Sequence, residues 1–236
     1  LSSPFCIDSF DLLRKFNLDF IKIPSGEITN LPLLRHIRKF NNDIILSTGM
    51  SNLNEIKNAV QILKNKNRKI ILLHCNTEYP TPIFDINLNA MQALKKKFKL
   101  EVGYSDHSLG TQVPVIAASL GAKVIEKHFT ISKKMVGPDH VASLNPKELI
   151  SMVKAIRTTE IILGKSEKFV SNSEKKNLLI ARKSLFAACD IKKGEKFSLN
   201  NLVCLRPGSG ISPINIDQVC KRKAKKNILK GQLIKI

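Results

Sequence analysis

Short runs of apolar residues recur along the first two thirds of the chain, and longer segments with a helical pattern separate them. The centres of successive runs lie about 20 to 30 residues apart, which is the length of one strand-helix repeat in a parallel sheet. This alternation indicates an α/β fold. It predicts five strands, at residues 20–23, 44–46, 69–73, 101–103 and 123–125.

Two of the intervening segments carry clear helix signals. Asn52 can cap a helix and Glu55 follows three residues later, which is a capping-box arrangement. The apolar residues after Asn52 then fall on one helical face: Leu53, Ile56, Val60 and Leu63. Residues 114–120 form a short apolar helix pattern, and Gly121 is placed to end it.

The number of repeats points to a barrel with a part missing. Residues 1–5 read as one more strand in front of the five, whereas a closed (β/α)₈ barrel takes about 250 residues. We therefore expect residues 1–164 to form a TIM-type (β/α)₈ barrel that lacks about two N-terminal βα units. As a consequence, we expect the chain alone to have little or no activity.

A change of pattern marks the end of this region. Residues 165–177 are rich in Gly, Ser, Lys and Glu without apolar periodicity, which predicts a linker. Residues 178–236 are expected to form a small β-rich domain with strands at 184–188, 202–205 and 233–236.

Composition narrows the classes of function. A net charge of +20 raises the possibility of a nucleic-acid partner, but the lysines are spread along the chain and no aromatic residues alternate with them. We expect a solvated basic face, including the cluster at residues 221–226, with the gathering of anionic substrates as a second possibility. The five cysteines form no C-x-x-C pair, which argues against disulfides and zinc. The absence of a long apolar run predicts a cytoplasmic protein without a membrane partner.

Polar, reactive residues follow nearly every predicted strand, where barrel enzymes carry their chemistry. The first strand brings a cation, a hydroxyl and a carboxylate together: Lys22, Ser25 and Glu27. The second ends in Ser47-Thr48-Gly49 ahead of a helix, an arrangement that suits phosphate but is also ordinary turn chemistry.

Three histidines stand at equivalent positions near the ends of successive strands: His74, His107 and His128. Of these, His107 and His128 could bind one divalent ion through two imidazole nitrogens and leave positions open for oxygen ligands. Mn²⁺ or Mg²⁺ fits such a set, while imidazole alone leaves Zn²⁺, Fe²⁺ and Co²⁺ open.

The strand-end motifs, taken in order, resemble those of the N-acetylneuraminate (sialic acid) synthase family, which includes the legionaminate and pseudaminate synthases. They are residues 22–30, 47–50, 74–75 with 79–81, 105–107, 126–130 and 137–139. Residues 184–185, 190–195 and 206–211 resemble the small antifreeze-like (SAF) domain of that family.

The resemblance implies a reaction and its residues. Phosphoenolpyruvate would condense with an N-acylated amino sugar, such as N-acetylmannosamine, to give a nonulosonic acid and phosphate. Four residues match positions that hold phosphoenolpyruvate: Lys22, Ser25, Ser47 and Ser105. Thr77 stands where some members have an asparagine near that substrate, and Asn76 is one place earlier.

The resemblance also assigns the sugar and metal sites. Four residues match positions around the sugar: Glu27, Tyr79, Asp139 and Arg206. In the family, the arginine comes from the SAF domain of the neighbouring subunit in a homodimer. The metal ligands match His107 and His128, with Mn²⁺ preferred and Mg²⁺ or Co²⁺ as alternatives. Glu27 is our leading candidate for proton handling.

Three alternatives stay open. Within the family, the product could be legionaminate or pseudaminate. From another class, the chain could be a non-catalytic binding protein that uses the antifreeze-like domain. It could also be an inactive fragment whose motifs persist without function.

Overall fold

The computed structural model describes residues 1–236, which separate into two compact units, Leu1–Lys165 and Ser166–Ile236. The first unit is built on one parallel five-stranded sheet whose spatial order follows the chain. Its strands are β1 (Phe20–Ile23), β2 (Asp43–Ser47), β3 (Ile70–Cys75), β4 (Glu101–Asp106) and β5 (Ile125–Lys127). Each lies on or directly beside a predicted strand, and the predicted α/β class is confirmed.

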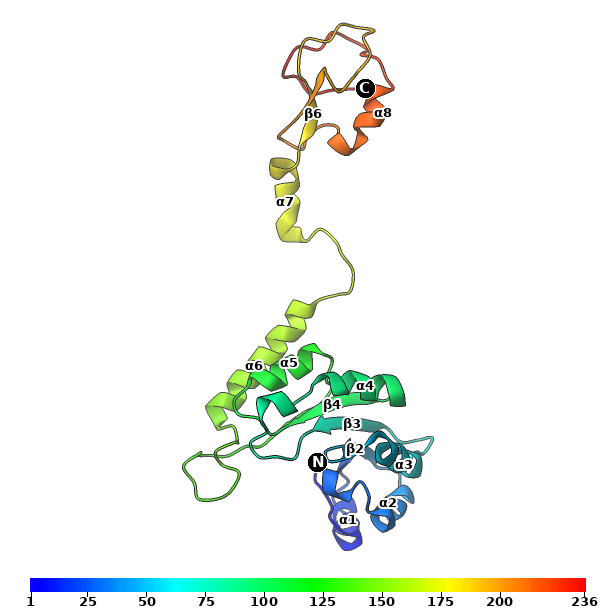
Figure 1. The fold of residues 1–236 in the computed structure, drawn as a ribbon, viewed down its shortest axis with the longest axis vertical. Coiled ribbons are helices and arrows are strands. Elements are labelled where there is room, and N and C mark those ends of the chain that lie inside the picture. The colour runs from blue at the N-terminus through cyan, green and yellow to red at the C-terminus, as the bar shows by residue number, and fades with distance from the viewer. The chain divides into compact units, whose positions relative to one another are not determined.

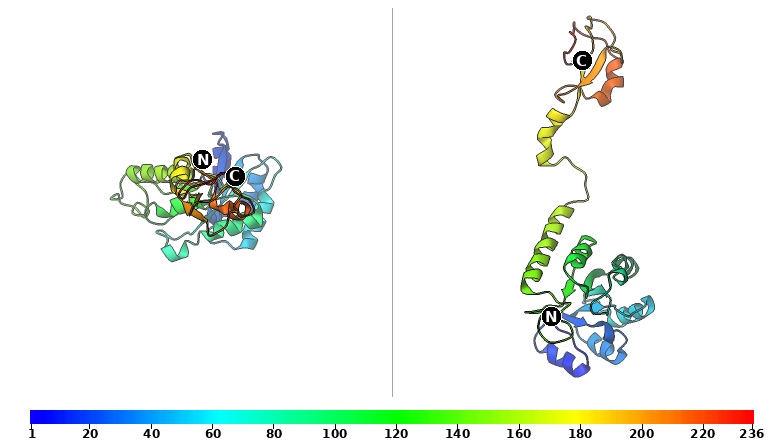
Figure 2. Two further views of the ribbon diagram at one scale, coloured as in Figure 1. Left: turned by 90° about the horizontal axis from the view of Figure 1, so that it is seen from above. Right: turned by 60° about the vertical axis from the view of Figure 1, so that its left-hand side comes forward.

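The sheet is curled, and the helices of this unit lie on the outer side of the curl (Figures 1 and 2). These helices are α1 (Ile7–Arg14), α2 (Leu31–Arg38), α3 (Leu53–Leu63), α4 (Asn89–Phe98), α5 (Gln112–Ser119) and α6 (Pro146–Leu163). The predicted capping box of α3 is present, since the Glu55 carboxylate accepts the Asn52 backbone N–H at 2.8 Å and Asn52 accepts from Glu55. Gly121, with a φ of +92°, follows the end of α5 as expected.

Alternation along each strand separates an outer face from a concave inner face. Outward residues such as Ile21, Leu46 and Leu72 are fully buried against the helices. Inward residues form a smaller apolar cluster, made of Ile45, Ile71 and Leu73 with Phe20 and Val124 beside it. The next inward positions toward the carboxyl ends are polar, so the concave face changes from apolar to polar along the strand direction.

Residues 1–5 were predicted to form a strand, but the structure shows only a parallel bridge between Ser2 and Ile21. The Lys22 backbone N–H donates to the Ser2 carbonyl at 3.0 Å. Pro4 has no N–H to continue such a ladder, which explains why the pairing stops. Two further βα units, as part of a complete barrel, stay a prediction.

The second unit contains α7 (Asn172–Ala181), an antiparallel pair of strands, β6 (Ser184–Ala187) and β7 (Leu202–Leu205), and the short helix α8 (Ile216–Cys220). Its own core includes Leu185, Phe197 and Ile234. The predicted strand at 233–236 is reduced to one bridge, between Phe186 and Leu233.

Helix α7 overlaps the predicted linker at residues 165–177. A capping box between Ser171 and Glu174 begins this helix, and none of its residues is buried. Apolar periodicity predicts a helix only where one helical face is buried. Since α7 buries no face, the pattern of apolar residues does not predict this helix. Across the whole chain, no helix combines the length and apolar character needed to cross a bilayer.

Candidate active site at the carboxyl ends of the strands

A cavity of about 300 Å³ lies at the polar end of the concave face. Residues from the ends of all five strands line it: Lys22, Pro24, Ser25, Gly26, Ser47, Met50, Cys75, Thr77, Tyr79, Ser105, His107, Glu126 and His128. The predicted convergence of the two histidines with the lysine and serines at one mouth is therefore confirmed. The chemical roles of these residues stay predictions.

One side of the cavity is built for an anion. The Ser25 hydroxyl accepts the backbone N–H of Gly49 at 3.0 Å, and its oxygen lies 3.2 Å from the Cys75 sulfur. Ser47 is 1% exposed, and its hydroxyl has no hydrogen-bond partner. A buried polar atom of this kind costs stability unless a ligand pairs with it. The site thus offers two hydroxyls and a lysine to an oxyanion.

Glu126 also lines the cavity, although it is not among the site residues predicted from the sequence. Its Oε1 accepts the Ser105 hydroxyl at 2.6 Å and lies 3.1 Å from Nζ of Lys22. Glu126 stands two residues before His128, so alternation places both on the inner face. Applying the alternation rule to this strand would have found the carboxylate.

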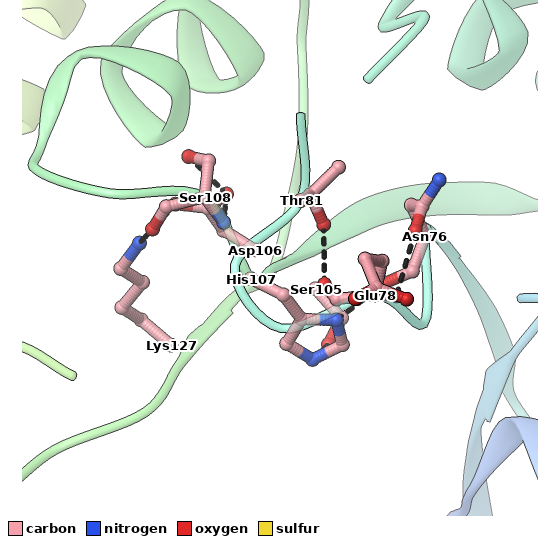
Figure 3. A network of polar contacts seen from close by, with 8 residues as sticks. All are labelled: Asn76, Glu78, Thr81, Ser105, Asp106, His107, Ser108 and Lys127. Carbon is pink, nitrogen blue, oxygen red and sulfur yellow. Dashed lines mark hydrogen bonds and ion pairs between the residues drawn. The ribbon is translucent and has the colours of Figure 1, made fainter. Parts of the chain in front are cut away.

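The rings of the two predicted metal ligands lie edge to face. The rings of His107 and His128 have centroids 5.4 Å apart and planes at 83°. Nδ1 of His107 lies 2.5 Å from the Asn76 carbonyl oxygen, so the Nδ1 proton is donated there and the lone pair is on Nε2 (Figure 3). Burial lowers the pKa of His107, which keeps the ring neutral. A hydrogen bond from one ring nitrogen to a carbonyl orients an imidazole whose other nitrogen binds a metal.

The donor set fits a divalent cation with several oxygen ligands. Groups of three or more His, Cys, Asp or Glu placed to hold a metal are absent. A divalent cation bound here would take two imidazoles from the chain and its other ligands from water and substrate oxygens.

Tyr79 covers the pair of histidines. Its ring stacks on His107 with centroids 4.0 Å apart and meets the edge of His128 at 5.2 Å. Burial raises the pKa of the Tyr79 hydroxyl, which therefore stays protonated at neutral pH. Asp139 lies beside this group without lining the cavity, its Oδ2 3.8 Å from Nδ1 of His128.

Several predicted residues lie elsewhere. Glu27 does not line the cavity, and its carboxylate accepts from the Asn30 amide at 2.6 Å. Arg206 belongs to the second unit, where its Nε donates to the Ala181 carbonyl. His74 does not share the position of the other histidines, because strand parity turns it to the outer face. There its Nε2 lies 2.8 Å from the Ile86 carbonyl oxygen.

The fold and the cavity define a class: a βα half-barrel with an anion pocket and a pair of imidazoles at the carboxyl ends of its strands. The NeuB family profile matches residues 1–168, and the SAF domain profile matches residues 182–236. The chain belongs to the NeuB family and carries a SAF domain.

Curated relatives agree with this assignment. The chain is 52% identical to N,N'-diacetyllegionaminic acid synthase of Campylobacter jejuni over 100% of its own length and 71% of the relative. It is 40% identical to pseudaminic acid synthase of the same species, covering 99% of the chain and 68% of the relative.

A solved structure extends the comparison. The N-acetylneuraminic acid (sialic acid) synthetase of Leptospira borgpetersenii, in complex with citrate, is 37% identical with a TM-score of 0.70. That match covers 75% of this chain and 62% of the Leptospira chain.

Proposed function

We propose that the chain carries the active site of a nonulosonic acid synthase, which condenses phosphoenolpyruvate with an N-acylated amino sugar and releases phosphate. The observation that supports this most is the single cavity in which a lysine, several hydroxyls and two imidazoles meet. Family membership supports the same reaction, since relatives are named as legionaminic and pseudaminic acid synthases.

Phosphoenolpyruvate is placed at the anion side of the cavity. Lys22 supplies the positive charge, while Ser25 and Ser47 donate hydroxyl protons to phosphate or carboxylate oxygens. The Ser25 oxygen already accepts from the Gly49 N–H, so its proton can go to the ligand in place of the Cys75 sulfur 3.2 Å away. Ser105 reaches the same space from β4.

Mn²⁺ is the proposed metal, held by His107 and His128. When bound, such an ion polarises the aldehyde oxygen of the open-chain sugar as a Lewis acid. Tyr79 packs on one imidazole and limits the positions that the sugar can take. Holding both substrates in one small cavity supplies much of the rate.

Glu126 is the better placed carboxylate for proton handling. Carbon 3 of phosphoenolpyruvate attacks the aldehyde carbon, and water adds at carbon 2 before phosphate leaves. Glu126 faces the cavity between Lys22 and Ser105, where it can accept the proton that the water loses. Glu27 keeps the role implied by its match to the sugar site.

The remaining sugar contacts are proposals from the family resemblance. Asp139 would approach the sugar from the loop beside His128, and Arg206 would come from the SAF domain of a second subunit in a cytoplasmic homodimer. The 52% identity to the N,N'-diacetyllegionaminic acid synthase favours an acceptor with two N-acetyl groups over N-acetylmannosamine.

Direct binding and single-turnover chemistry test the proposal together. Phosphoenolpyruvate is titrated into the chain with Mn²⁺ present, and phosphate release is then followed with each of several N-acylated sugars. The chain is used in excess over the sugar, so that a single turnover is followed. Binding that Lys22→Met abolishes, and sugar-dependent release, support the proposal; a folded chain that binds no phosphoenolpyruvate contradicts it.

A further inference from the structure

A fully buried ion pair lies behind the two histidines, on the outer face of the sheet. Nζ of Lys127 is 2.6 Å from Oδ2 of Asp106, and their side chains are 2% and 0% exposed. Lys127 also donates to the Ser108 carbonyl, while Oδ1 of Asp106 accepts both the N–H and the hydroxyl of Ser108 (Figure 3). Each charge is therefore paired and hydrogen-bonded.

The pair bridges β4 and β5 at the point where both strands end. Asp106 and Lys127 are direct neighbours in the parallel register. Each is followed immediately by an imidazole that faces the cavity, His107 after Asp106 and His128 after Lys127. Whatever fixes the separation of the two strands here therefore also fixes the separation of the two rings.

The remaining constraints on His107 come from the other side. Its carbonyl accepts the Thr81 backbone N–H at 3.0 Å, and its ring is bound to the Asn76 carbonyl. These contacts join His107 to the loop after β3. By contrast, β5 has only three residues and pairs within the sheet with β4 alone. Ser105 also donates to Glu126 across these two strands at 2.6 Å, and the His128 carbonyl accepts the Leu144 N–H at 2.8 Å. The ion pair adds to these bonds a fully buried, charged link at the strand ends themselves.

We propose that Asp106 and Lys127 are positioning residues that set the spacing of His107 and His128, and thereby the affinity of the site for a divalent metal. This inference rests on the proposed function of the two imidazoles. Neither charge contacts the cavity, so the pair acts through the strand ends. The physical basis is the cost of separating two buried charges, which resists small displacements of β5.

The test compares the same substitution in two cross-strand ion pairs of one sheet. Lys127→Met removes the buried pair and leaves Asp106 bound to Ser108. Lys69→Met removes the pair between Lys69 and Glu101, 2.7 Å apart and about half exposed at the amino ends of β3 and β4. Mn²⁺ affinity is measured from the electron paramagnetic resonance signal of free Mn²⁺, and unfolding curves confirm that each variant is folded.

A double variant guards against loss of the fold. Asp106→Asn with Lys127→Met leaves no uncompensated buried charge, and Asn can still accept from the Ser108 N–H. We expect Mn²⁺ affinity to fall about tenfold or more in the Lys127→Met and double variants, which is the usual effect of losing a residue that orients a metal ligand. In Lys69→Met, we expect the affinity to change less than about twofold.

Affinity within about twofold of the unchanged chain in a folded Lys127→Met or double variant overturns the inference. An equal loss of Mn²⁺ affinity in Lys69→Met also overturns the inference, because the effect would then not be specific to the strand ends that carry His107 and His128. An unchanged chain that binds no Mn²⁺ instead overturns the proposed metal site, and the inference with it.

Discussion

Nζ of Lys22, on β1, lies 3.1 Å from Oε1 of Glu126, on β5. The two residues stand on the first and last strands of the sheet, so this ion pair spans the open side of the curl. An anion that enters the cavity competes with Glu126 for the lysine. Under the proposed function, this pair would couple the binding of phosphoenolpyruvate to the release of a carboxylate that can then act on a proton.

Glu126→Gln separates binding from chemistry. Removing the competing charge should keep or tighten the binding of phosphoenolpyruvate, while single-turnover phosphate release should fall about 100-fold or more, as for the loss of a general base. Glu27→Gln is the comparison, since both are conservative changes of a carboxylate. With both substrates saturating, a larger loss of rate in Glu27→Gln than in Glu126→Gln would show that the role was assigned to the wrong residue.

Ser47→Ala should move stability and ligand affinity in opposite directions. Its buried hydroxyl has no partner, so replacing it should raise the free energy of unfolding by about 1 kcal/mol. The same change should weaken phosphoenolpyruvate binding about tenfold. Ser143→Ala is the control for stability, because that buried hydroxyl donates to the Asp139 carbonyl at 2.7 Å and its loss should destabilise. A less stable Ser47→Ala chain with unchanged affinity would contradict the anion site.

Gly49→Ala should damage the anion pocket by steric contact. A Cβ atom at this position would lie 2.7 Å from Cγ2 of Thr77, 2.9 Å from the Ser25 hydroxyl and 3.0 Å from the Cys75 sulfur. We expect phosphoenolpyruvate affinity to fall about tenfold or more, because Ser25 must shift and loses its bond to the Gly49 N–H. Gly26→Ala is the matched control, since Gly26 also lines the cavity but a Cβ there meets nothing within 4 Å. Calorimetric titration of both variants with phosphoenolpyruvate measures the difference. Equal affinities of the two variants would contradict the steric effect expected at Gly49.

Strand positions and the inner residues of the site were predictable from the sequence, because both follow from alternation on a parallel sheet. Lys22, Ser47 and Ser105 each occupy an inward position near a strand end. Residues reached through turns were harder to place. The short helix Ser25–Glu27 turns Ser25 into the cavity but directs the Glu27 carboxylate to Asn30.

The errors at His74 and Glu126 have one physical origin. The sequence groups His74 with His107 because each lies near a strand end, but side chains one residue apart face opposite sides of a sheet, and the two differ in parity. Glu126 was passed over although it shares parity with His128. The buried pair of Asp106 and Lys127 could not be predicted, since pairing on the outer face depends on the register of β4 and β5.

His74 predicts a specific acid sensitivity. Burial lowers the pKa of His74 in the folded chain, whereas the pKa of a histidine in an unfolded chain is about 6.5. Below about pH 6.5 the unfolded state therefore binds the proton more readily than the folded state does. As a result, the free energy of unfolding falls as the pH is lowered, until the pH is below the folded pKa. His74→Gln should make the loss of unfolding free energy between about pH 7 and 5.5 smaller, as measured by urea denaturation. An equal or steeper loss would show that His74 does not contribute.

Mn²⁺ binding by three histidine variants is the sharpest test of a metal site shared by His107 and His128. His107→Ala and His128→Ala each remove an imidazole from the cavity, while His74→Gln changes a histidine at a neighbouring strand end that faces the outer side. In a titration with Mn²⁺, we expect the first two variants to lose at least about tenfold in affinity and His74→Gln to bind as tightly as the chain without substitutions. Retained affinity in His107→Ala or His128→Ala, with both chains folded, would contradict a shared metal site.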